Sequence, residues 1–380
     1  MYGYSTVFGI DVHARSTTVC ALDPATGEVE RRKFPGVAPF DEMTAWFEEF
    51  PGPRRGFYEA GCTGYGAARA LTAGDTTVVP VAPHATPSSP ASRARKNDRA
   101  DAENLAAHGS HDELTVVWVP DPEVEGLRDA SHAIEDLTDM LAQARQRVVS
   151  LLMRHDYVWT GEAEGLKRPR PLWGRHHREW LEGVDLGSPG SRLALDTMLG
   201  VVRELEEALR EAVEGARKAA AASAIAPAIE AAQCLKGVGF LTALSVAAQI
   251  GDFERFGSGR KVTAYFGLAP RDGSTGDDVN LGRITKQGCS TSRRYLVEGA
   301  WVHSWCGTGP AARRPDVPRE VASEAAKLSR RLTEHRRSMI KGGLDARKAN
   351  VATAAETARF ILFLGRDAMR AAAAAKAAES

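Results

Sequence analysis

The sequence predicts an α/β domain followed by a mostly helical remainder, so the whole chain combines α/β and all-α architecture. Four apolar segments of strand length, at residues 6–12, 17–24, 54–61 and 76–83, fall within the first hundred residues. Residues 121–230 are instead dominated by helix-forming residues. A chain of 380 residues is too long for one ordinary core, so we expect two or three domains.

Acidic residues mark the ends of two of the predicted strands. Asp11 stands at the end of the first strand, and Glu59 lies near the end of the third, just before Gly61. A short helix is predicted over 65–71, between that strand and the next. Because an aspartate at a strand end is often only a cap, these positions alone do not define a site.

A segment rich in proline, serine and arginine, HATPSSPASRARK, follows the last predicted strand. It holds Arg93, Arg95 and Lys96, which we predict to contact a nucleic-acid backbone. The next segment, NDRADAENLAAHG, has helical composition and ends at Gly109, which is suited to a C-cap.

Two aspartates of this predicted helix lie three residues apart. Asp98 and Asp101 therefore share one helix face, where their like charges repel. A hard divalent cation such as Mg²⁺ neutralises carboxylates in this arrangement and prefers oxygen ligands. Together with Asp11 and Glu59, the pair fits a two-metal site for phosphodiester chemistry.

The middle of the chain predicts long amphipathic helices. Leucine, isoleucine and valine recur at steps of three, four and seven over residues 127–152 and again over 195–213. Such seams pair as a coiled coil within one chain or across a dimer, and the pattern does not choose between the two. Residues 167–183 predict a loop or short helical crossover. Its adjacent His176 and His177 point in different directions on a helix, so we do not expect them to bind a metal.

The segment that begins near Cys234 resembles a helix-hairpin-helix element. Lys236, Gly237 and Gly239 form its predicted hairpin, just before a helical segment. Backbone amides and a helix N-terminus in such a hairpin can contact DNA phosphate without reading sequence.

One serine, Ser274, lies in the stretch GLAPRDGSTGDDVNLGRITKQG. The flanking glycines break regular structure and can hold its hydroxyl toward a substrate, although a Gly-Ser-Thr-Gly turn is also a common loop tip. Basic residues follow that could bind a phosphate beside this serine: Arg283, Lys286, Arg293 and Arg294.

Bulk composition excludes several classes of protein. No apolar run approaches the roughly 20 residues that a bilayer requires, and the first residues do not form a signal peptide, so we expect a cytoplasmic protein. The five cysteines are scattered without a CxxC pair, which argues against a disulfide framework or a zinc site and favours packing roles. Basic and acidic residues balance at 49 each, so only local basic clusters can support nucleic-acid binding.

Several motifs together resemble the insertion sequence 110 family of transposases, which includes the Piv-type DNA invertases. GIDVHARSTTVCALD, YEAGCTGYGAARAL and KNDRADA resemble the family's DEDD domain, which is RuvC-like and of the RNase H type. KVTAYFGLAPRDGSTG, GRITKQG and SRRYLVEGAW resemble its C-terminal transposase domain. The resemblance extends to LTEHRRSMIKGGLDARKANVATAAETARFILFLGRD, with Gly342 and Gly343 as a turn.

The resemblance implies a domain plan. We expect a RuvC-like DEDD domain over 1–120, a helical coiled-coil linker or dimerisation region over 121–230, and a C-terminal transposase domain over 231–370. Residues 371–380 form an alanine-rich tail that we predict to be a frayed helix or disordered.

The resemblance also implies a reaction. Asp11, Glu59, Asp98 and Asp101 match the four metal-binding acids, and Ser274 matches the nucleophile that joins covalently to DNA. We therefore expect a recombinase that joins element ends and target DNA with Mg²⁺ and a structured, element-encoded guide (bridge) RNA. Joining two duplexes favours a homodimer or homotetramer.

Two alternatives remain open at this point. A metal-dependent junction resolvase would use the four acids without serine chemistry. A catalytically inactive relative would keep only the fold and bind nucleic acid.

Overall fold

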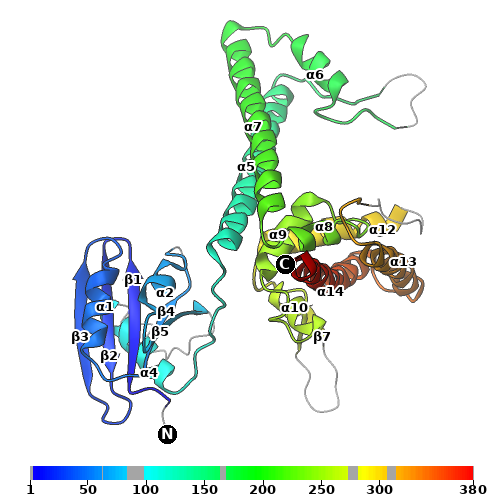
Figure 1. Ribbon diagram of the computed structural model, residues 1–380. Coiled ribbons are helices and arrows are strands. Elements are labelled where there is room, and N and C mark those ends of the chain that lie inside the picture. The colour runs from blue at the N-terminus through cyan, green and yellow to red at the C-terminus, as the bar shows by residue number, and fades with distance from the viewer. Residues whose placement is uncertain are drawn as a thin grey trace. The chain divides into compact units, whose positions relative to one another are not determined.

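The computed structural model describes residues 3–61, 63–83, 98–162, 168–272, 281–305 and 314–379. It divides into two compact units, Met1–Asp121 and Pro122–Ser380 (Figure 1). Among the described residues, no helix is both long enough and apolar enough to cross a membrane.

A five-stranded mixed sheet forms the centre of the first unit. Its strands are β1 (Thr6–His13), β2 (Ser16–Leu22), β3 (Val29–Pro35), β4 (Arg54–Glu59) and β5 (Thr76–Val81), in the spatial order β3-β2-β1-β4-β5. The first three strands pair antiparallel, whereas β4 lies parallel to both β1 and β5. This topology is compatible with the RNase H-like fold that the sequence predicts.

Helices cover both faces of this sheet. On one face, α1 (Phe40–Glu48) and α2 (Gly66–Leu71) bury a cluster that includes Phe8, Ile10 and Trp46. On the other face, α4 (Asp98–Ser110) packs with Leu105 against Val7 and Phe57. Burial of large apolar side chains on both faces supplies most of the driving force for folding.

The four predicted strands are confirmed, and β3 and α1 are additional elements. In β3 only Phe34 is buried, because the strand VERRKFP is a charged sheet edge that shows no alternation of apolar residues. The sequence did contain a signal for α1: Met43, Trp46 and Phe47 recur at helical spacing and are all buried.

The second unit begins with a long helical hairpin. Helices α5 (Pro122–Met153) and α7 (Pro189–Ala222) run alongside each other, with the short α6 (Arg175–Glu182) between them in the chain (Figure 1). The leucine and valine seams of α5 and α7 share one buried cluster, so the two seams pair with each other within the chain. The predicted short crossover is therefore confirmed as α6.

The rest of the second unit is a helical assembly around the last helix. Helix α14 (Ala346–Glu379) packs against five other helices of this part of the chain, all shorter than itself. In chain order the elements of this part are α8 (Ala226–Ala232), α9 (Phe240–Ile250), α10 (Gly259–Tyr265), β6 (Pro270–Asp272), β7 (Leu281–Ile284), α11 (Ser290–Ala300), α12 (Val302–Trp305) and α13 (Arg319–Lys341). The turn at Gly342 and Gly343 lies between α13 and α14, as predicted, and α14 continues through the alanine-rich tail to Glu379.

Candidate metal-binding and nucleic-acid-binding sites

Asp11 and Glu59 lie at the ends of two adjacent parallel strands. The register of β1 and β4 pairs Ile10 with Tyr58, so the next residue on each strand is the acid. Side chains alternate between the faces of a sheet, and paired residues of parallel strands share a face. Val7 and Phe57 both pack toward α4, which places Asp11 and Glu59 on that same face.

Gly9 brings α4 close to this face of the sheet. A Cβ atom at residue 9 would overlap the carbonyl oxygen of Ala102 and the backbone nitrogen of Ala106. Ala102 and Ala106 also pack against Cys20, which is paired with Gly9 across β1 and β2. Only glycine allows a helix backbone to approach a strand this closely.

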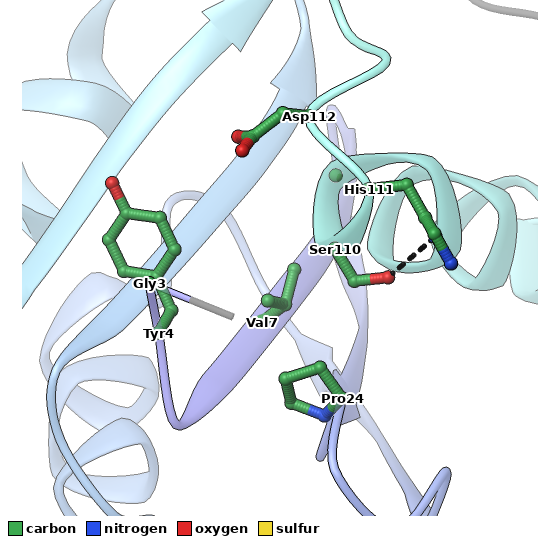
Figure 2. A pocket seen from close by; sticks show the side chains of 8 residues that line it. Gly3, Tyr4, Val7, Pro24, Ser110, His111 and Asp112 are labelled. Atoms are coloured by element: carbon green, nitrogen blue, oxygen red, sulfur yellow. Dashed lines mark hydrogen bonds between the residues drawn. The ribbon is translucent and has the colours of Figure 1, made fainter. Parts of the chain in front are cut away.

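The direction of α4 points its N-terminal turn toward Asp11. The C-terminal end of the helix lies at the start of β1, where Gly109 and Ser110 line a pocket of about 310 Å³ with Tyr4 and Val7 (Figure 2). Its middle crosses Gly9. The first turn, Asp98 to Asp101, therefore extends toward the residues that follow Gly9 in β1. Because this pocket is lined by Tyr4 and Val7, it lies at the opposite end of β1 from Asp11.

We call Asp11, Glu59 and Asp101, with Asp98 at the start of α4, the acidic edge. Asp101 is half-buried beside the stripe of α4 that faces the sheet, whereas the side chain of Asp98 lies outside the described residues. His13 Nε2 is 2.9 Å from Asp11 Oδ2, so a histidine also lies at this edge. Within the described ranges, no three His, Cys, Asp or Glu side chains gather closely enough to hold a metal ion.

The donor chemistry of the acidic edge nevertheless suits a hard cation. Its carboxylates offer oxygen atoms from two neighbouring strands and from the helix turn directed toward them. Oxygen-only ligand sets are those that Mg²⁺ prefers. Asp11, Glu59, Asp98 and Asp101 are therefore the residues that would hold it.

Two sets of predicted site residues fall outside the described residues. They are Ser274, together with the basic residues Arg93, Arg95 and Lys96. The chain on either side of Ser274 is described: β6 and β7 pair antiparallel, with Asp272 opposite Leu281. Ser274 itself lies between these two strands in the sequence, outside the described residues.

Two basic residues of the second unit are exposed at or just after β7. Arg283 lies on β7, and Lys286 follows it with a positive φ of 58°. Both side chains are exposed. They are available to a phosphate near β7.

Arg293 and Arg294 have structural partners in the second unit. Arg293 Nη1 donates hydrogen bonds to the carbonyl oxygens of Phe266 (3.1 Å) and Gln287 (2.8 Å). Arg294 forms ion pairs with Glu135 (2.6 Å) and Asp139 (3.1 Å) of α5. A phosphate at Arg294 would have to compete with these two carboxylates, a feature that the sequence does not reveal because α5 lies more than 150 residues earlier.

The predicted hairpin at Lys236 is a tight loop between α8 and α9. Gly237 has a φ of +83°, and a Cβ there would overlap the carbonyl oxygen of Gly299 in α11. The reverse also holds, because a Cβ on Gly299 would overlap the carbonyl oxygen of Gly237. The backbone N–H of Lys236 donates to Ser329 Oγ (3.0 Å), and exposed Gly239 is the N-cap of α9.

His176 and His177 have separate environments. His177 is buried among Trp159, Trp173 and Trp180, and burial holds its pKa below the usual value. His176 is more exposed and lies 3.2 Å from Glu179. The two neighbouring imidazoles therefore have different partners.

The described chain thus combines a mixed sheet that carries acids near two strand ends with a mostly helical second unit. Two family models match this chain. Residues 8–155 match the DEDD transposase model of the IS110 group, and residues 230–314 match the model described as the transposase IS116/IS110/IS902 family. The chain belongs to this family of insertion sequence transposases, as the sequence motifs predicted.

Curated relatives support the same assignment. The transposase y4qE of Sinorhizobium fredii (strain NBRC 101917 / NGR234) is 32% identical over 314 residues, which cover 82% of this chain and 75% of the relative. The transposase for insertion sequence element IS1533 of Leptospira borgpetersenii is 27% identical over 298 residues, covering 74% of this chain and 81% of the relative.

Proposed function

We propose that this transposase recombines its own insertion sequence through a serine–DNA intermediate, with the acidic edge as its metal-binding site. The observation that carries the proposal is the placement of Asp11 and Glu59 on one face of adjacent parallel strands, with the first turn of α4 directed toward them. Family membership implies DNA transposition in general, and the proposal names the groups that perform it.

In the proposed reaction, the Ser274 hydroxyl gives up its proton as its oxygen forms a bond to a backbone phosphorus of the DNA. One bond from that phosphorus to a sugar oxygen breaks, and the leaving oxygen takes up a proton. The phosphoserine link conserves the bond energy, so a new strand end can reverse the step and rejoin the DNA. Mg²⁺ bound at the acidic edge would stabilise the negative charge that develops on the phosphate oxygens.

Basic residues have a separate role in this proposal. Arg283 and Lys286 are exposed and lie within twelve residues of Ser274 in the sequence, and would position the DNA backbone without reading its sequence. Arg93, Arg95 and Lys96 precede Asp98 and are proposed to do the same near the acidic edge. A charge-neutral chain can bind nucleic acid through such local basic groups.

Sequence choice is proposed to come from base pairing with a structured guide RNA encoded by the element. In such a system the protein recognises shape and backbone, while pairing supplies specificity. Synapsis of element ends with a target would place two or four copies of this chain in one complex.

The test uses the full-length protein with its candidate RNA, Mg²⁺ and labelled DNA that contains the element ends and a target. Denaturing electrophoresis and mass spectrometry detect a covalent protein–DNA adduct. We expect an adduct at Ser274 that is lost in Ser274→Ala and retained in Ser258→Ala, an exposed serine of the same unit. Asp11→Asn should also abolish the adduct.

Each alternative gives a different result in this assay. Cleavage without an adduct, unchanged in Ser274→Ala, would identify a metal-dependent nuclease without serine chemistry. Binding without cleavage in wild type and in every variant would identify an inactive relative.

A further inference from the structure

A cysteine and a histidine from distant parts of the chain meet in the second unit. Cys289 is the N-cap residue of α11, and its Sγ lies 3.8 Å from Nε2 of His132 on α5. Cys289 is only half-buried, whereas Cys20 and Cys234 are buried. The pairing of Cys289 with His132 differs from the packing role that the sequence predicts for all the cysteines.

The surroundings of Cys289 favour its thiolate form. Burial alone would raise the pKa of Cys289, but hydrogen bonds from His132 and from Ser292 outweigh it and lower the pKa to about 7. In turn, the hydrogen bond to Cys289 raises the pKa of His132 against the opposing effect of burial, and the charges of Asp129 and Asp136 add to the increase. The N-terminus of the 11-residue helix α11 further stabilises a negative charge at its cap.

Two other cysteines of the same chain provide an internal contrast. Cys20 is buried in the first unit, and burial raises its pKa to about 11. Cys234 is also buried, and burial raises its pKa above the usual value. Within the part of the chain that the structure describes, no histidine contributes to the pKa of either thiol.

We propose that Cys289 and His132 form an activated thiol pair and that Cys289 is a modification site for small, soft carbon electrophiles. The cysteine thiolate is the reacting form of the sulfur, and the imidazolium of His132 holds the proton that the thiol has lost. With a haloacetamide, a bond forms between Sγ and carbon, the carbon–halogen bond breaks, and halide leaves. Alkylation would remove the contact between Cys289 and His132, which joins α11 to α5.

The proposal is independent of the serine chemistry, and iodoacetamide tests it directly. The native full-length protein is alkylated briefly at a series of pH values, and the extent at each cysteine is measured by peptide mass spectrometry. We expect the rate at Cys289 to reach half its maximum near pH 7, while Cys20 and Cys234 react at least tenfold more slowly. The same cysteine in urea-unfolded protein serves as the reference, with its midpoint near the ordinary thiol value of about 8.5.

A matched pair of variants assigns the effect to His132. His132→Gln should slow alkylation of Cys289 at pH 7 about tenfold and move its midpoint toward that of the unfolded reference. His176→Gln, at an exposed histidine of the same unit, should leave both unchanged. A native midpoint equal to the unfolded one in wild type would overturn the proposal without reference to any variant, and so would an unchanged rate in folded His132→Gln.

Discussion

Both units use glycine to bring backbone segments together, but in different settings. In the first unit, Gly9 lies inside a regular strand and admits the backbone of α4 at Ala102 and Ala106. In the second unit, Gly237 lies in a loop with positive φ and meets Gly299, a glycine within α11. The first contact directs acidic residues toward a strand end, whereas the second holds a loop against a helix.

The two candidate sites depend on packing in different ways. The acidic edge depends on one strand position, because the angle and depth of α4 determine where its first turn lies. The tight loop at Lys236 depends on the mutual contact of Gly237 and Gly299. It also depends on the hydrogen bond that the Lys236 N–H donates to Ser329 Oγ. A single added methyl group should therefore disturb the first unit more than the second.

The largest effect is expected for Gly9→Ala. The new Cβ would overlap two backbone groups of α4, which cannot move as a flexible side chain could, so we expect a loss of about 3 kcal/mol or more. Chemical denaturation followed by circular dichroism measures this loss. Gly61→Ala is the control, because a Cβ there meets nothing within 4 Å. Equal stability of the two variants would contradict the close α4 contact.

The second unit should lose stability in acid through His303, next to the Gly237 contact. His303 is buried against Thr333 and near Lys236, and burial lowers its pKa to about 4 from an unfolded value of 6.5. The unfolded chain therefore binds a proton that the folded chain rejects, and stability falls as the pH drops from 6.5 to 4. The loss should approach about 3 kcal/mol at the lower pH.

Urea unfolding of wild type and His303→Gln between pH 4 and pH 7.5 measures this dependence. The variant lacks the titrating group, so its stability should change less steeply with acid than that of wild type. Identical slopes in the two proteins would show that His303 does not keep its lowered pKa.

A smaller effect is expected for Gly299→Ala. The new Cβ would overlap the carbonyl oxygen of Gly237, but alanine also favours the helix by about 1 kcal/mol, so the net loss should be about 2 kcal/mol. Gly215→Ala in α7 is matched to it, since that helical glycine has nothing near its Cβ position. Gly215→Ala should stabilise the protein slightly. If Gly299→Ala also stabilised it, the close contact between Gly299 and the Gly237 carbonyl oxygen would be contradicted.

Sequence patterns predicted four of the five sheet strands, the two long helices and the family, but not which partner each long helix takes. Strands β1, β2 and β5 contain runs of apolar residues, and α5 and α7 carry leucine seams, so hydrophobic patterning reveals them. The charged strand β3 shows no such pattern, because its burial is limited to Phe34.

Less of the candidate site than of the fold could be predicted from the sequence. Motifs identified Asp11 and Glu59, but the role of Gly9 depends on a helix that lies about ninety residues later in the chain. The carboxylates of Glu135 and Asp139 around Arg294, and the contact of His132 with Cys289, likewise join segments that no local pattern connects.

The most direct test of the acidic edge is Mn²⁺ binding to the full-length protein, measured by electron paramagnetic resonance. Mn²⁺ takes the oxygen ligands that suit Mg²⁺. We expect binding to weaken at least tenfold in each of the variants Asp11→Asn, Glu59→Gln, Asp98→Asn and Asp101→Asn. Glu42→Gln should leave it unchanged, because Glu42 lies on α1, which packs against the opposite sheet face. Equal Mn²⁺ affinity in wild type and all four variants would contradict the assignment of a metal site to this edge.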